Sequence, residues 1–222
     1  METKLGFSLS LSLSLSVSLP HIILKKMTKS KAAYKWCSET GIIDDMTEPF
    51  PITSSGSEWA GFTDQVMGGI SKGICTREVI EGKVCNLMKG RVSLYNNGGF
   101  IQMATALSTD PALSLTVDAS RFDGVELEVL YRGDEDEETF NVHLRNPACL
   151  RQFSSYRGSF FVKKNQDWQT VRIPFDNFVG YGPGSSEIPF DASELRRLGI
   201  VAIGKAMEVY LAVAGVRFYK ES

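Results

Sequence analysis

Apolar and polar residues alternate along most of the chain after residue 83. Alternation with a period of two places successive side chains on opposite faces of an extended strand. In Val125–Tyr131, for example, Val125, Leu127 and Val129 share one face, while Glu126 and Glu128 share the other. The pattern predicts a protein built mainly of β-strands.

The predicted strands are short and are separated by turn signals. They are Val84–Leu94, Phe100–Thr105, Val125–Tyr131, Phe140–Arg145, Ser159–Val162, Trp168–Ile173, Leu198–Ile203 and Val209–Tyr219. The run Asn96–Gly99 predicts a hairpin turn between the first two strands. One helical turn is expected near Ala192–Arg197. Many short strands with regular turns are typical of an all-β sandwich or barrel.

The N-terminal part of the chain does not follow this pattern. Serine alternates with leucine or valine from Phe7 to Leu19, and two interpretations stay open. The segment is either a Ser-rich organelle-targeting sequence or the translation of a CT-dinucleotide repeat that precedes a true start at Met27. We therefore set residues 1–33 apart as disordered, targeting or artefactual. Residues 34–57 are an expected irregular lead-in with Pro49 and Pro51, and residues 58–222 form the β-sandwich domain.

Composition argues against several function classes. The formal net charge is −2, so no overall field attracts nucleic acid or an anionic membrane. No apolar run approaches the roughly 20 residues that span a bilayer. The four cysteines form no CxxC pair, which predicts no metal site and favours a reducing compartment, with a Cys75–Cys85 bridge as a minor alternative. The sequence predicts no cofactor.

Candidate catalytic residues are few. His143 is the only histidine within the predicted domain, and it lacks an adjacent serine or cysteine motif, so we expect a protein that is not an enzyme. Asn141, His143 and Arg145 should share one face of their strand and form a tentative binding face, near Glu126, Glu128 and Arg132 if the strands pair. The alternative is an ordinary solvent-facing sheet surface.

Several co-linear motifs resemble the complex I intermediate-associated protein 30 family. The segment Trp59–Ser71 is similar to its Trp…Asp…Val-Met-Gly-Gly-x-Ser signature. Lys89–Ser93, Asn97–Phe100, Trp168–Phe175, Leu198–Ile200 and Val216–Tyr219 are similar to further family segments in the same order. The residues that carry the resemblance are Trp59, Asp64, Met67, Gly68, Gly69, Ser71, Gly98, Gly99, Phe100, Trp168, Pro174 and Phe175.

The resemblance implies a jelly-roll β-sandwich of the galactose-binding-like type. It implies a non-catalytic, chaperone-like factor that binds protein subunits of mitochondrial respiratory complex I during assembly, peripheral to that membrane complex. The alternatives are an assembly factor for a photosynthetic complex in a plastid, or a module that binds a carbohydrate or another small ligand; a cytoplasmic location is a further alternative. The signature itself is either purely structural or both structural and in contact with a partner.

Within the signature, each residue type has a physical reason to be there. Trp59 and Phe62 can bury a large apolar area. Asp64 can accept hydrogen bonds from backbone N–H groups and so fix a turn. Gly68 and Gly69 allow a backbone course that is closed to other residues. We therefore expect Asp64 to stabilise the fold.

Overall fold

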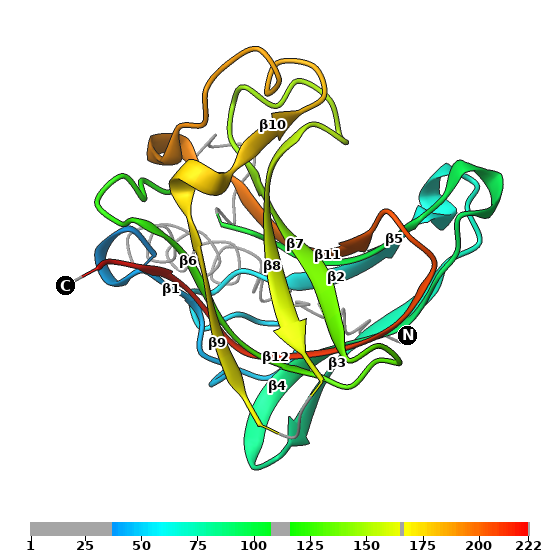
Figure 1. The fold of residues 1–222 in the computed structure, drawn as a ribbon. Coiled ribbons are helices and arrows are strands. Elements are labelled where there is room, and N and C mark those ends of the chain that lie inside the picture. The colour runs from blue at the N-terminus through cyan, green and yellow to red at the C-terminus, as the bar shows by residue number, and fades with distance from the viewer. Residues whose placement is uncertain (1–36, 108–115, 165–166, 222) are drawn as a thin grey trace, which may run out of the picture.

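The computed structural model describes residues 37–107, 116–164 and 167–221, which fold into two antiparallel sheets packed face to face (Figure 1). Sheet I contains, in spatial order, β3 (Lys72–Ile80), β4 (Lys83–Val92), β12 (Met207–Tyr219), β6 (Gly124–Tyr131) and β9 (Gln169–Pro174), with β1 (Ile42–Asp44) paired to β12. Sheet II contains β10 (Val179–Tyr181), β8 (Ser155–Lys163), β7 (Glu137–Arg145), β11 (Arg197–Ile203), β5 (Phe100–Ala106) and β2 (Trp59–Thr63). The predicted β-sandwich is confirmed.

The chain passes from one sheet to the other between most consecutive strands, which is the jelly-roll arrangement. Residues 37–40 are α-helical, and the other described helical elements are single 3₁₀ turns: η1 (Asp64–Met67), η2 (Tyr95–Asn97), η4 (Phe175–Asn177) and η5 (Ala192–Glu194). η5 confirms the expected helical turn, although Arg197 already belongs to β11.

The core lies between the two sheets and follows the alternation seen in the sequence. Val125, Leu127 and Val129 of β6 are fully buried against residues of sheet II. Tyr131 meets Phe140 edge to face across the sheets, with the ring centroids 5.9 Å apart. Each fully buried side chain of this size contributes about 1.5–3 kcal/mol relative to an exposed one. The alternation of apolar and polar residues therefore identifies the strands, because the apolar residues are those on the face of the strand that packs against the other sheet.

One expectation about strand pairing is wrong, and the strands β1, β2, β3 and β10 were not predicted. The turn at Asn96–Gly99 does not close a hairpin, because β4 belongs to sheet I and β5 to sheet II. Asn96 and Asn97 do adopt positive φ, but here the turn carries the chain across the sandwich. The strand β3 was not predicted, because it lies at the edge of sheet I and exposes apolar residues such as Ile74 and Val79. A strand at an edge has no need of strict alternation.

A buried ion pair ties the first strand to the edge of sheet I. The Asp44 carboxylate accepts hydrogen bonds from the Trp59 indole at 2.7 Å and from the Arg77 guanidinium at 2.9 Å. Met46 and Ser54 donate backbone N–H groups to its other oxygen at 3.0 and 3.1 Å. The Arg77 and Asp44 side chains are only 9% and 0% exposed. The segment before β2 is thereby fixed to the sandwich.

We expect Asp44→Ala to lower the free energy of unfolding by about 3–5 kcal/mol, because it leaves the Arg77 charge buried and unpaired. Urea denaturation followed by circular dichroism measures this loss. The double variant Asp44→Ala/Arg77→Met should recover part of it, since no charge then remains buried. Equal stability of Asp44→Ala and the unchanged protein would show that the pair is not needed.

Candidate interaction site

The Asp64 side chain lies at the junction of two loops that belong to different parts of the chain. It is fully buried at the start of η1, directly after β2. Its carboxylate accepts hydrogen bonds from the Ser71 hydroxyl at 2.5 Å and the Ser71 N–H at 2.9 Å. It also accepts the N–H of Gly99, beyond η2, at 2.6 Å, and that of Phe100 at 3.4 Å. This Asp64 hydrogen-bond network holds the η1 and η2 loops side by side.

The glycines of the signature make this close approach possible. A Cβ at Gly69 or at Gly98 would overlap with the Asp64 carboxyl group. Gly68 ends η1 with φ at 87°, and its N–H reaches the Gln65 carbonyl at 3.1 Å. Residues with a side chain rarely adopt this left-handed conformation. The Gly-Gly pairs are therefore required by the turn and by the space around one carboxylate.

The electrostatics of Asp64 favour its charged form. Burial alone would raise the pKa of this carboxyl group. The hydrogen bonds from Ser71, Gly99 and Phe100 outweigh that effect and hold the pKa of Asp64 below its ordinary value. The group is therefore ionised at neutral pH and binds the two loops as a charged acceptor.

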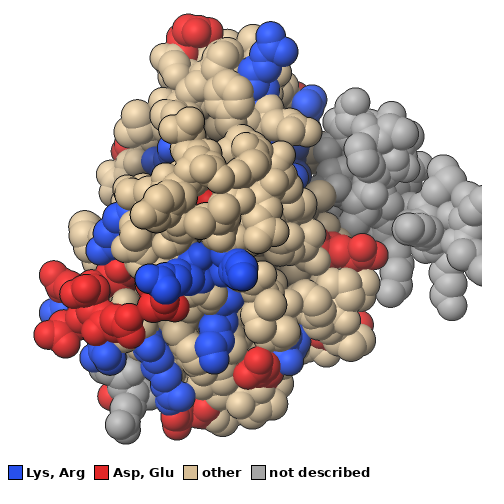
Figure 2. All heavy atoms as spheres, turned by 90° about the vertical axis from the view of Figure 1, so that its right-hand side faces the viewer, with Lys and Arg blue, Asp and Glu red and all other residues tan. Residues whose placement is uncertain are grey.

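Large apolar side chains project from the same two loops into solvent. We call them the apolar two-loop patch: Val66, Met67, Ile70, Leu94 and Tyr95. Val66, Met67 and Tyr95 are 72%, 63% and 75% exposed. A hollow of about 640 Å³ adjoins the patch, lined by Ile70, Leu94 and Tyr95 together with Lys72 and Arg91, among others. Seen from this side, the surface carries few charged side chains at its centre, with lysines and arginines below it (Figure 2).

The remaining residues of the resemblance lie elsewhere. Trp59 is buried and bonded to Asp44, as described above. Phe100 starts β5 and is half-buried beside the network. Trp168 is half-buried beneath the Lys83 ammonium on the outer side of sheet I. Pro174 ends β9, and Phe175 packs against Phe178, Phe190 and Phe218. The signature thus divides into one loop cluster and several separate packing positions.

The tentative binding face lies on the outer side of sheet II. Asn141, His143 and Arg145 do share this face of β7, each half-buried. Asn141 accepts a hydrogen bond from the Ser159 hydroxyl at 2.8 Å. Arg145 donates to the carbonyls of Arg151 and Gln152 at 2.7 and 2.8 Å.

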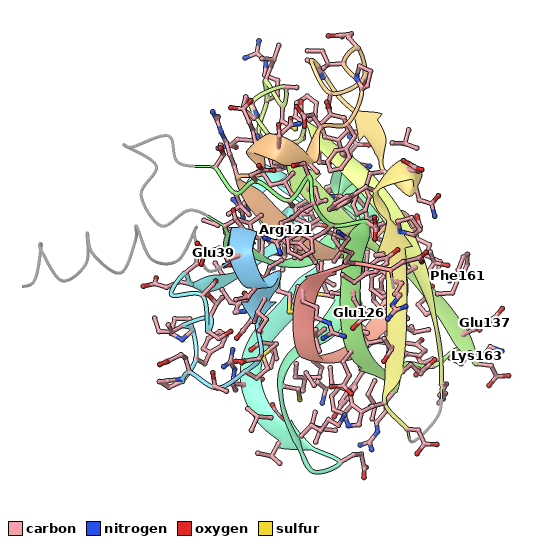
Figure 3. The ribbon with its side chains drawn as sticks, turned by 90° about the vertical axis from the view of Figure 1, so that its left-hand side faces the viewer. Glu39, Arg121, Glu126, Glu137, Phe161 and Lys163 are labelled. Atoms are coloured by element: carbon pink, nitrogen blue, oxygen red, sulfur yellow. The ribbon has the colours of Figure 1, made fainter. Side chains whose placement is uncertain are left out.

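The acidic residues expected beside this face are not there. β6 lies in sheet I, where Glu126 pairs with Arg172 at 2.6 Å and with Arg217 at 2.7 Å. Glu128 pairs with Lys83, and Arg132 with Glu81. Figure 3 shows Glu126 well apart from Phe161 and Lys163, which project from β8 of sheet II. The expectation failed because β6 and β7 are consecutive in sequence but belong to opposite sheets.

The structure adds four residues to this face that were not expected there: Arg157, Arg197, Phe62 and Tyr181. The Arg157 guanidinium lies 3.5 Å from the centre of the Tyr181 ring, and that of Arg197 lies 5.0 Å from the Phe62 ring. Burial and the nearby Arg157 charge lower the pKa of His143 to about 3. Only the strand order brings these four residues to one face, because they lie on β2, β8, β10 and β11.

Groups suited to catalysis or to metal binding are scarce in the described residues. Burial raises the pKa of the Cys37, Cys75 and Cys85 thiols to about 11, and none of the four cysteines is in a disulfide. Within residues 37–107, 116–164 and 167–221, no three His, Cys, Asp or Glu side chains gather to hold a metal ion. In the same ranges, no helix has the length and apolar character required to cross a membrane.

The fold and its surfaces define a galactose-binding-like β-sandwich. The family model of complex I intermediate-associated protein 30 (CIA30) matches residues 49–211, and the chain belongs to this family. A comparison with curated protein sequences finds no match.

Solved structures show the same fold. A family 11 carbohydrate-binding module from Clostridium thermocellum, in complex with a β-1,3-1,4-mixed-linked tetrasaccharide, is similar with a TM-score of 0.58 at 12% identity, over 81% of this chain and 95% of that one. The same family of module from the cellulosomal cellulase Lic26A-Cel5E gives 0.59 at 11% identity, over 81% and 94%. A family 30 carbohydrate-binding module gives 0.51 at 16% identity, over 79% and 97%. At such identities the likeness concerns the fold alone.

We expect Asp64→Ala to lower the free energy of unfolding by roughly 1–3 kcal/mol at pH 7, because it leaves buried donors of Ser71 and Gly99 without an acceptor. The pKa of Asp64 is lower in the folded state, so its contribution is complete above the unfolded pKa of about 4 and is lost as pH falls through the folded value. The difference between the two proteins should therefore narrow in acid.

Urea titrations at several pH values measure this difference. Asp176→Ala provides the control, because Asp176 is an exposed aspartate in η4 and its removal should cost little. A melting temperature that is unchanged by Asp64→Ala would refute the role of the network.

Proposed function

We propose that this protein is a non-catalytic assembly factor that binds protein subunits of mitochondrial respiratory complex I before they are incorporated. Membership of the CIA30 family supports respiratory complex I as the complex that is assembled, and therefore also the mitochondrial location. The apolar two-loop patch is the observation that carries the mode of action. An assembly factor needs a surface that binds incompletely assembled proteins. The exposed apolar side chains of this patch are suited to such binding.

The patch is costly for a protein that works alone. Val66, Met67 and Tyr95 keep most of their surface in water, although burial of each would contribute about 1.5–3 kcal/mol. A contiguous exposed apolar area with a polar rim is typical of a protein-binding surface. Lys72 and Arg91 supply part of that rim. Met67 adds an unbranched side chain that adapts to partners of different shape.

The Asp64 network gives this surface a fixed shape. Both loops are anchored to one buried carboxylate, and Asn96 adds a hydrogen bond to the Gly68 carbonyl at 3.3 Å. A preorganised surface loses less conformational entropy on binding than a mobile one. The structural and the partner-contact interpretations of the signature are therefore compatible: its polar and glycine residues build the loops, while Val66, Met67 and Ile70 face outward.

The alternative of a carbohydrate-binding module has weaker support. The likeness to such modules reaches only the fold. The Arg157 guanidinium lies over the Tyr181 ring at 3.5 Å, so this ring is not free to stack on a sugar, although Tyr95 and Phe161 are exposed aromatic residues. A second alternative is the assembly of a photosynthetic complex, which would use the same apolar two-loop patch. The identity of the captured subunits distinguishes this alternative from the proposed function.

We expect Val66→Asp to reduce the capture of complex I subunits from mitochondrial extract about tenfold or more, because a charge in a desolvated contact is unfavourable. Affinity capture on the immobilised full chain, followed by mass spectrometry, measures the recovered subunits.

Val79→Asp is the matched control. Val79 lies on β3 and is 71% exposed, against 72% for Val66, so both changes add the same charge at equal exposure. It should leave capture unchanged. Recovery of photosystem subunits from a chloroplast extract, with no complex I subunit recovered from the mitochondrial one, would favour the photosynthetic alternative. If Val66→Asp leaves capture unchanged, or reduces it no more than Val79→Asp does, the patch is not the surface that binds complex I subunits.

A further inference from the structure

Three arginines lie on three neighbouring strands on the outer face of sheet II, and the side chains of Arg157 and Arg197 extend toward opposite edges of the sheet. We call Arg145 on β7, Arg157 on β8 and Arg197 on β11 the arginine cluster. The strand register places Arg145 directly opposite Arg197, and His143 directly opposite Arg157. Directly opposite residues of an antiparallel pair have Cβ atoms about 4.5–5.5 Å apart, and like charges at that spacing destabilise the sheet. The arrangement therefore calls for a compensating negative group.

No carboxylate of the described residues supplies that group. The ion pairs of the described chain involve other basic residues, and none includes Arg145, Arg157 or Arg197. Arg145 is held by two backbone carbonyls, while Arg157 and Arg197 lie over aromatic rings. These contacts orient the guanidinium groups without neutralising them, so the cluster keeps its full charge.

Partial burial of these arginines makes an anionic partner more favourable. It lowers the pKa of the Arg157 guanidinium, and burial together with the Arg145 charge lowers that of Arg197. His143 lies between the arginines, and its Nε2 atom is buried without a hydrogen-bond partner. A charge removed from water without a counter-charge costs free energy. An extended molecule that carries several negative charges would relieve this cost at several positions together.

The chemistry of the face indicates which anion. Phosphate sites often use backbone N–H groups at loops or helix ends. On β7 and β11 these groups are occupied, because each strand is paired on both sides. Recognition is left to side chains, and the planar guanidinium group pairs with a carboxylate or a phosphate through two parallel hydrogen bonds. The rings of Phe62 and Tyr181 add apolar surface of the kind that a polypeptide contacts.

We propose that the arginine cluster binds an acidic polypeptide segment, whose carboxylates pair with Arg145, Arg157 and Arg197. This inference rests on the proposed function. It adds a second contact with the same partner, between the arginine cluster and acidic residues of that partner. The cluster also connects to the apolar two-loop patch. Arg197 lies over Phe62 of β2, and β2 leads directly into η1. One partner can therefore contact the patch with apolar residues and the cluster with acidic ones.

The test uses the full chain and a fluorescein-labelled peptide of alternating glutamate and glycine, with fluorescence anisotropy as the readout. The unchanged protein should bind the peptide, and binding should weaken as salt is added. Arg145→Gln, Arg157→Gln and Arg197→Gln should each weaken it about tenfold or more, since each removes a charge-assisted hydrogen-bond pair. Arg→Lys at the same positions should retain part of the affinity.

Arg121→Gln is the matched control. Arg121 lies over the Phe122 ring at 5.4 Å, as Arg197 does over Phe62, but outside the cluster. It should leave the affinity unchanged. Circular dichroism checks that each variant is folded, and where a Gln variant is not, the Lys variant at that position decides.

Three results would overturn the inference. The first is no peptide binding by a protein that still captures complex I subunits, which leaves the proposed function standing. The second is an equal effect of Arg121→Gln. The third is displacement of the peptide by inorganic phosphate at concentrations at which acetate has no effect, which would make the cluster a phosphate site. Peptide binding by a protein that captures no complex I subunit would support the arginine cluster and count against the proposed function.

Discussion

The buried carboxylate of Asp64 connects three parts of the chain. It ends the course of β2, receives the N–H and hydroxyl of Ser71 just before β3, and receives the N–H of Gly99 just before β5. The two sheets are thereby joined at the side where the η1 and η2 loops lie (Figure 1). A buried charge is stable only when hydrogen bonds replace its lost hydration. The network satisfies that condition, and the position of the apolar two-loop patch depends on it.

Sequence reasoning succeeded where the physical cause is local. The alternation in β6 reports burial directly, and it identified the strand because Val125, Leu127 and Val129 all face the core. The role expected for Asp64 as an acceptor of backbone hydrogen bonds agrees with its contacts to the N–H groups of Ser71 and Gly99. The cause is local, because the short side chain lies beside the backbone of the turn that follows it. The jelly-roll topology came from the family resemblance rather than from the pattern.

It failed where the answer depends on which strands are neighbours. Period two assigns a side chain to a face but does not say which sheet contains the strand. Glu126 was therefore expected beside His143, although β6 and β7 lie in opposite sheets. The same limit concealed the arginine cluster, because Arg145 and Arg197 are far apart in sequence and meet only through the pairing of β7 with β11. Exposure of Val66 and Met67 was equally invisible, since a loop has no periodicity to report it.

We propose that the apolar two-loop patch contacts complex I subunits directly. Photo-cross-linking tests it most directly, with a photoreactive benzoylphenylalanine placed at position 67 in one protein and at position 79 in another. Both positions are well exposed, and only the first lies in the patch. If the patch is the contact surface, position 67 should cross-link to a complex I subunit and position 79 should not. Cross-links from position 79 alone, or from neither position while the subunit is still captured, would contradict this proposal.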